Sequence, residues 1–144
     1  MAELCRAALA ELGPERGGPL FIAREARREP VDVSLKAALD DPDHHLVVGT
    51  FDDVAIGYLA GRIEDLADGR RLGVIEDVYV EPGARAVGVG EAMMDQALAW
   101  FEAGRCFGVD AIALPGMRET KNFFETFGFT ARMLVVHHRL DAAP

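Results

Sequence analysis

The sequence predicts a mixed α/β (α+β) domain, built on a mostly antiparallel sheet that helices flank. Three strand-type segments, 45–51, 54–62 and 70–80, follow one another across short turns, which favours an antiparallel meander. An amphipathic helix over 88–103 then leads to an apolar segment at 109–114. A helix that crosses between two strands makes them parallel, so the last two strands predict the mixed character of the sheet.

Composition limits the classes of protein to consider. The 144 residues, half of them apolar, fit one domain over 1–144 with a core of its own. No apolar run approaches the roughly 20 residues of a membrane span, and the N-terminus lacks a signal-peptide pattern, so a cytoplasmic location is the default. The net charge of −9 argues against a nucleic-acid surface. We expect no nucleic-acid and no membrane partner; the oligomeric state stays open between monomer and homodimer.

Three helices are predicted before the meander. Apolar residues recur on one face of residues 1–12, which indicates an amphipathic helix. A second helix is expected over 19–29, and a third is capped by Asp32 or Ser34 and runs to Leu39.

Turn residues define the remaining elements. Asp52-Asp53 and Asp68-Gly69 predict the two hairpin turns, and Gly57 indicates a bulge or close packing. After the strand at 109–114, we expect a short helix over 118–127 and a long final strand over 129–140.

The loop between the meander and the long helix has the features of an anion site. The strand ends at Val80, and Gly88-Val89-Gly90 opens the helix. Glycines at a helix start leave backbone N–H groups unpaired and approachable, with the positive end of the helix dipole behind them. Arg85 adds a guanidinium that can fork onto phosphate oxygens.

Three motif interpretations compete for this loop. A P-loop needs Lys and then Ser or Thr after its last glycine, but Val89 follows Gly88. A dinucleotide fingerprint is disfavoured because Met93 replaces its third small residue and Asp110 begins the next strand rather than ending it. The third, Arg-x-x-Gly-x-Gly after Val-Tyr-Val-x-Pro, has all its parts and resembles the pyrophosphate loop of the GNAT superfamily of N-acetyltransferases. For the loop alone, a glycine-rich turn that binds nothing is the other interpretation.

A second motif strengthens the resemblance. The last helix of this family usually ends Tyr-x-x-x-Gly-Phe, and here the chain reads Phe124-Glu-Thr-Phe-Gly-Phe129. The order of elements is also similar over most of the chain, and it implies a sheet splayed between the strand ending at Val80 and the strand 109–114. One departure is at the front, where the family has a strand before its first helix and this sequence has no room for it; either that strand is missing or the chain starts late.

The resemblance implies an acyl-CoA-dependent N-acyltransferase that moves acetyl from acetyl-CoA to a primary amine of a small molecule or protein, without a metal. Pyrophosphate would sit on the loop amides beside Arg85, and the pantetheine arm would pair with the strand end like an added strand. The implied cofactor-binding residues are Val78, Tyr79, Val80, Arg85, Ala86, Val87, Gly88, Val89 and Gly90. Ala86 and Val87 depart from the basic residues common beside the family's arginine.

A general base is needed because a free alkyl ammonium, with a pKa of about 10.4, is unreactive while charged. Strand alternation places Glu76 on the face of Val74 and Val78, where apolar neighbours would raise its pKa. We therefore expect Glu76 to be the catalytic base, against the plainer interpretation of a solvated acid. A bulge here would swap the faces and favour Asp77 instead.

Phe124 departs from the tyrosine that commonly protonates the leaving thiolate in this family. Phenylalanine cannot donate a proton, and Tyr58 and Tyr79 are the only tyrosines of the chain. This substitution sustains an alternative, a catalytically weak GNAT-fold module that binds acyl-CoA and regulates a partner. No motif specifies which amine is acylated or how long the acyl group is.

Other reactive side chains give weaker patterns. His44 and His45 follow three aspartates without metal-ligand spacing, so no metal site is expected. Cys5 and Cys106 have no Cys-x-x-Cys spacing, and Cys106 lacks an oxyanion motif that would make it a nucleophile with His137 or His138. Packed thiols are the expectation for both cysteines.

Overall fold

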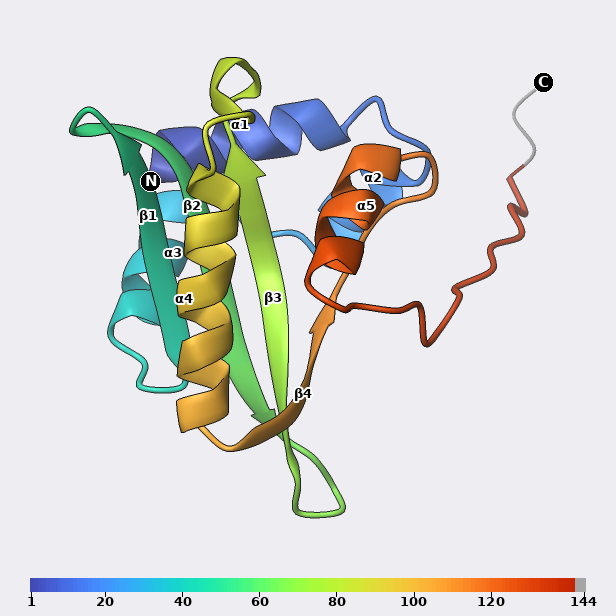
Figure 1. Cartoon of the computed structure of the whole chain (residues 1–144). Helices are drawn as coiled ribbons and strands as arrows, with labels where there is room; N and C mark the ends of the chain where they lie inside the picture. Colours follow the sequence, from blue (N-terminus) through green and yellow to red (C-terminus); the bar gives the residue numbers. More distant parts are fainter. Residues whose placement is uncertain (142–144) are drawn as a thin grey trace.

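A computed structural model describes residues 1–141 and shows a four-stranded sheet between helices (Figure 1). The elements are α1 (Ala2–Leu12), α2 (Gly18–Arg24), α3 (Val31–Leu39), β1 (His44–Phe51), β2 (Val54–Asp65), β3 (Arg71–Val80), the 3₁₀ helix η1 (Pro82–Ala84), α4 (Val89–Ala103), β4 (Cys106–Ala111) and α5 (Arg118–Thr126).

The strand order β1-β2-β3-β4 confirms the predicted mixed, mostly antiparallel sheet. β1 pairs with β2 and β2 with β3 in antiparallel fashion, whereas β3 and β4 are parallel because α4 crosses between them. Some boundaries differ from the prediction. α2 ends at Arg24, and β4 begins three residues before 109. α3 begins at Val31 after Pro30, so the predicted cap at Asp32 or Ser34 is wrong, and Glu29 Oε2 accepts the Val31 N–H at 3.0 Å.

Helices cover both faces of the sheet and create two cores. α4 lies along one face, where Met94 and Phe101 are fully buried against the strands. α1 and α3 lie behind the opposite face (Figure 1), and there Cys5 and Val31 surround the buried ring of Tyr58. The central strands β2 and β3 are therefore covered by a packed core on each face of the sheet.

Glycines in the strands make room for the ring of Phe101. A Cβ at Gly73 would come within 2.6 Å of Phe101 Cδ1, and one at Gly61 within 2.7 Å of Cζ. Gly73→Ala should therefore lower the free energy of unfolding by about 1–3 kcal/mol, the usual cost of overpacking. Gly108→Ala is the matched control, because a Cβ on this β4 glycine meets no atom within 4 Å. Equal denaturation midpoints for the two variants would contradict this packing.

The predicted turns are confirmed where local sequence determines them. Asp52 and Asp53 both have positive φ, 49° and 63°, as a two-residue hairpin turn requires. Gly57 is closely packed, since a Cβ there would lie 2.7 Å from the carbonyl oxygen of Tyr79. None of the helices within residues 1–141 combines the length and the apolar character needed to cross a bilayer.

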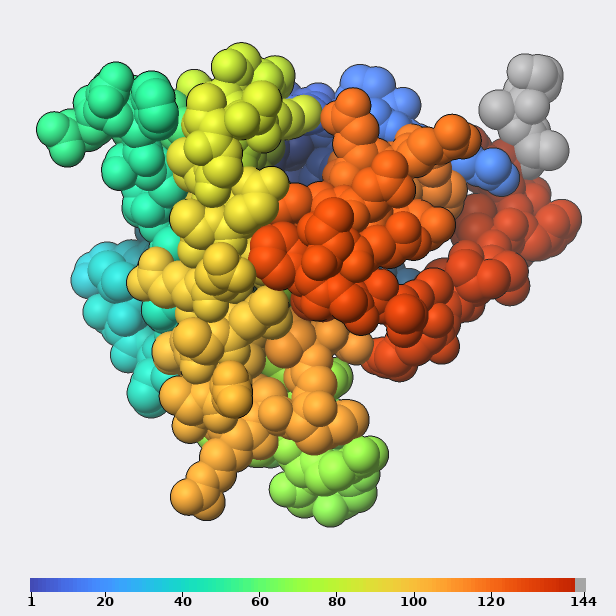
Figure 2. All heavy atoms as spheres, viewed as in Figure 1, coloured from blue at the N-terminus to red at the C-terminus, as the bar shows by residue number. Residues whose placement is uncertain are grey.

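The final strand predicted over 129–140 is wrong. Phe129 packs on the core and Arg132 pairs with Asp110, but the apolar side chains from Met133 to Val136 are exposed. In Figure 2 this red segment projects from the side of the molecule beyond α5. A strand needs a hydrogen-bonding partner, and the outer edge of β4 remains unpaired within the described part of the chain.

Candidate functional site

The site begins where β3 and β4 separate. Their parallel pairing ends at Ile75 and Ala111, whereas β3 continues to Val80 and stays paired with β2. The predicted splay between these strands is therefore confirmed. Beyond Ile75, no strand within residues 1–141 pairs with the outward main-chain groups of β3 on the β4 side, so an extended ligand can pair with them.

The glycine loop lies after the open end of β3, beyond the short helix η1. Gly88 is the N-cap of α4 with φ 83°, and no side chain caps this helix. The first-turn amides of Val89 and Gly90 have no intrahelical acceptor. A Cβ on Gly88 would meet no atom within 4 Å, so the approach to these amides is open. These features are the ones that an anion site at a helix start requires, so the loop stays the candidate for the predicted pyrophosphate site.

Arg85 is held at the same place by two contacts. Its Nε donates to the carbonyl oxygen of Val80 at 2.8 Å, and its Nη2 lies 2.7 Å from Glu11 Oε2 on α1. The hydrogen bond to Glu11 is the main reason that the pKa of Arg85 is raised. The guanidinium also lies 5.6 Å from the centre of the Tyr79 ring. Sequence reasoning missed Glu11, because nothing local marks a contact between residues 74 positions apart.

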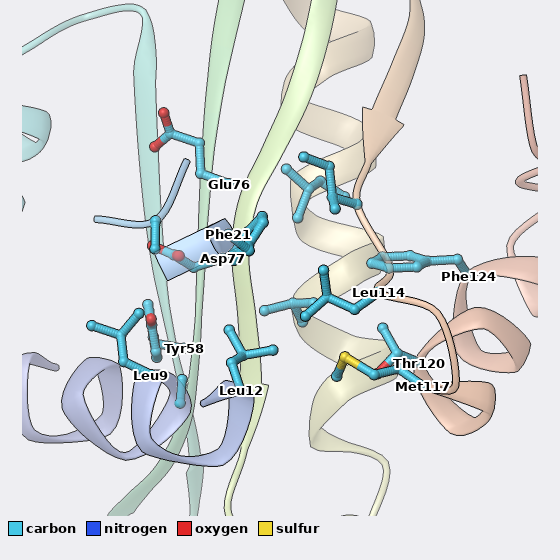
Figure 3. A pocket seen from close by; sticks show the side chains of 15 residues that line it. Leu9, Leu12, Phe21, Tyr58, Glu76, Asp77, Leu114, Met117, Thr120 and Phe124 are labelled. Atoms are coloured by element: carbon cyan, nitrogen blue, oxygen red, sulfur yellow. The ribbon is translucent and has the colours of Figure 1, made fainter. Parts of the chain in front are cut away.

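A cavity of about 90 Å³ opens beside this strand, on the α1 side of the sheet. Figure 3 shows Leu9 and Leu12 of α1 facing it, with Asp77 and Tyr58 on one side and Phe124 on the other. A larger cavity of about 400 Å³ adjoins it, and the two share the walls formed by Glu76 and Asp77. The carboxylates of β3 thus lie between the apolar cavity and a more charged one.

A β-bulge decides how these two carboxylates point. Asp77 pairs with Ala60 and Ile75 with the next residue, Gly61, so Glu76 is an extra residue in β3. Its oxygens lie 3.0 Å from Arg27 Nη2 and 3.0 Å from Arg62 Nε. The apolar surroundings predicted for Glu76 are therefore wrong, because the bulge breaks the alternation. In Figure 3 its carboxylate points away from the other labelled side chains, while Asp77 lies near Tyr58.

Arg27 ties the two carboxylates together from the loop between α2 and α3. Its side chain is only 7% exposed; Nε donates to Asp77 Oδ2 at 2.9 Å and Nη1 to Ser34 Oγ at 3.0 Å. Burial raises the pKa of Asp77 although the Arg27 charge opposes this shift. Sequence reasoning missed Arg27 and Ser34, which carry no motif and reach β3 only through the fold.

The tyrosines and Phe124 occupy different parts of the site. Tyr58 lines the apolar cavity, and its burial, with Cys5 and Asp77 beside it, raises the pKa of its hydroxyl. Tyr79 lies at the Arg85 end of β3. Phe124 is buried, with its ring centre 5.3 Å from that of Phe129. Its ring forms one wall of the cavity and cannot donate a proton.

The other reactive side chains do not join this site. Cys5 is buried, and Cys106 is half-buried at the far end of β4. His137 and His138 are exposed in the segment after α5. Across residues 1–141, no three His, Cys, Asp or Glu side chains are grouped so that they could hold a metal ion.

Comparison with known proteins decides the family. The profile described as the acetyltransferase (GNAT) family matches residues 8–129, most of the chain. The chain belongs to this family. No curated protein matches it. The GNAT assignment agrees with the open strand end, the glycine loop and the helix that follows them.

Solved structures show the same fold at low sequence identity. AAC(6')-Iy, in complex with a bisubstrate analogue that joins CoA to acetylneamine, aligns with a TM-score of 0.72 at 17% identity, covering 98% of this chain and 92% of that one. An aminoglycoside 6'-N-acetyltransferase from Acinetobacter haemolyticus gives 0.64 and 21%, covering 77% and 79%. A transcriptional regulator from Bacillus halodurans gives 0.68 and 19%, covering 97% and 95%.

Proposed function

We propose that this GNAT protein transfers an acyl group, acetyl in the first instance, from coenzyme A to a primary amine. The observation that carries the proposal is the end of β3, which is unpaired on the β4 side within residues 1–141 and which η1 and a short loop connect to the uncapped, glycine-rich start of α4. An extended thioester with an anionic end needs this combination of main-chain groups and free amides. The complex of AAC(6')-Iy with a CoA analogue supports coenzyme A as the donor.

The cofactor roles follow from this placement. The pantetheine arm pairs with the free main-chain groups of Val78, Tyr79 and Val80, and an amide there faces the thioester oxygen when it becomes an oxyanion. The pyrophosphate lies on the amides of residues 86–90 beside Arg85. The acyl end then reaches the cavity that Asp77 and Phe124 line from opposite sides.

For the general base, the bulge favours Asp77 over the sequence-based prediction of Glu76. Both Glu76 oxygens are engaged by arginines, so neither is free to contact the amine. Asp77 has one contact with Arg27, and burial raises its pKa toward the range in which a carboxylate accepts a proton usefully. Glu76 stays a prediction, and the two are separated by experiment below.

The function is tested by thiol release from acetyl-CoA in the presence of a panel of primary amines. Release that saturates with amine concentration is the expected result. If no amine accelerates thiol release although acetyl-CoA binds tightly, the protein is a binding module and the proposed enzyme activity is wrong.

That module is the second candidate, and Phe124 favours it. The position lacks a hydroxyl for the leaving thiolate, and one neighbour of the same fold is described as a transcriptional regulator. Coenzyme A is a thiol with a pKa near the ~8.5 of cysteine, so its thiolate leaves without strong acid assistance.

Phe124→Tyr should accordingly be neutral or modestly activating in the thiol-release assay. The added hydroxyl enters the cavity wall beside the proposed thioester and can supply a proton. Loss of all activity in a correctly folded Phe124→Tyr protein would instead show that the ring itself packs against the substrate.

A further inference from the structure

One ion pair, between Glu11 and Arg85, joins α1 beside the acceptor cavity to the proposed cofactor loop after β3. Glu11 and Arg85 are each about one-third exposed, at 38% and 37%, so solvent and ligands can reach the pair. The same guanidinium donates a hydrogen bond to the carbonyl oxygen of Val80, where the proposed pantetheine path begins. Without cofactor, the charge predicted to hold pyrophosphate is already neutralised by a carboxylate of the chain itself.

We propose that Glu11 is an internal competitor for Arg85, and that binding of the coenzyme A pyrophosphate displaces it and releases the end of α1. This inference rests on the proposed cofactor site, and it adds that a carboxylate of the chain itself competes with the cofactor for Arg85. A pyrophosphate carries more negative charge than one carboxylate, and the amides of the loop contribute further donors. The pyrophosphate therefore binds the Arg85 guanidinium in place of Glu11, and the Glu11–Arg85 ion pair breaks.

The pair also links the cofactor to the acceptor cavity. Glu11 lies in the last turn of α1, between Leu9 and Leu12, which line the cavity with Asp77 (Figure 3). Displacing Glu11 removes the tie between α1 and the loop after β3. Occupancy of the cofactor site thereby loosens one wall of the cavity in which the amine must bind, so the two ligands are thermodynamically coupled.

A double-mutant cycle tests the competition, with acetyl-CoA titrated calorimetrically into the full chain. Glu11→Gln keeps the shape of the side chain and removes its charge. It should tighten acetyl-CoA by about twofold to fivefold, the range expected for an exposed ion pair. Arg85→Ala should weaken binding by about tenfold or more, as loss of a charged hydrogen bond does. Adding Glu11→Gln to Arg85→Ala should then bring no further gain.

Glu119→Gln is the matched control for a general charge effect. Glu119 acts on Arg85 through space but makes no hydrogen bond to it. A gain from Glu119→Gln equal to that from Glu11→Gln would overturn the proposal. So would unchanged or weaker binding in Glu11→Gln, or a gain that persists in the Arg85→Ala background.

Amide hydrogen exchange supplies a readout that does not depend on affinity. Exchange in residues 8–12 should speed up when acetyl-CoA binds the wild-type protein, and should already be fast in Glu11→Gln. Exchange that slows in both proteins would contradict the release of α1. If Arg85→Ala binds acetyl-CoA as well as wild type, the cofactor site itself is misplaced; if it binds worse while Glu11→Gln shows no gain, only the competition fails.

Discussion

Asp77→Asn is expected to lower kcat/KM for amine acylation by at least about 100-fold at neutral pH, within the range that general bases contribute. The substitution keeps the shape of the side chain and its place beside Arg27, so acetyl-CoA affinity should change little. Because burial raises the pKa of Asp77 above its ordinary value of 3.8, the acidic limb of the wild-type pH profile should lie above that value. Asp77→Asn should remove that limb.

Glu76→Gln is the matched comparison, since it makes the same chemical change at the next residue. We expect a loss of less than about tenfold, because Glu76 organises Arg27 and Arg62 rather than taking the proton. A loss of tenfold or more in Glu76→Gln, with Asp77→Asn still active, would restore the sequence-based assignment. Thermal unfolding of both variants separates a catalytic loss from damage to the buried pair with Arg27.

Gly88→Val should weaken acetyl-CoA by at least about tenfold, because a branched side chain covers amides whose hydrogen bonds to a charged ligand are worth about 1.5–3 kcal/mol each. Gly88 has φ 83°, so the variant also carries backbone strain.

Gly69→Val controls for that strain. Gly69 has φ 85° and equally open surroundings, but it lies in the β2–β3 hairpin at the opposite end of β3. Both variants should lose similar stability, while only Gly88→Val should lose affinity in a calorimetric titration. Equal acetyl-CoA affinities for the two variants would contradict the proposal that this loop binds the pyrophosphate.

Local patterns predicted the elements whose determinants are themselves local. The paired aspartates at 52 and 53 determine their own turn, and Gly88 with its neighbours determines the start of α4. Alternation in β3 did not predict the direction of Glu76, because the bulge depends on how β2 aligns with β3. The apolar segment after Phe129 has strand-type composition, but a strand forms only beside a partner.

The charged contacts of the site could not be predicted from the sequence for a similar reason. Arg27 reaches Asp77 across 50 positions and Glu11 reaches Arg85 across 74, through the packing of helices on the sheet. The two motifs located the proposed cofactor loop and Phe124. The partners that set charge and pKa around them depend on the three-dimensional arrangement.

Amide hydrogen exchange with and without acetyl-CoA is the most direct measurement of where the cofactor lies. The account predicts slower exchange along the open end of β3, over 78–80, and in the loop amides over 86–90. The β2–β3 hairpin around Gly69 should be unaffected. Protection confined to the charged cavity around Arg62 and Glu25, with none in the loop, would contradict a cofactor held between β3 and the start of α4.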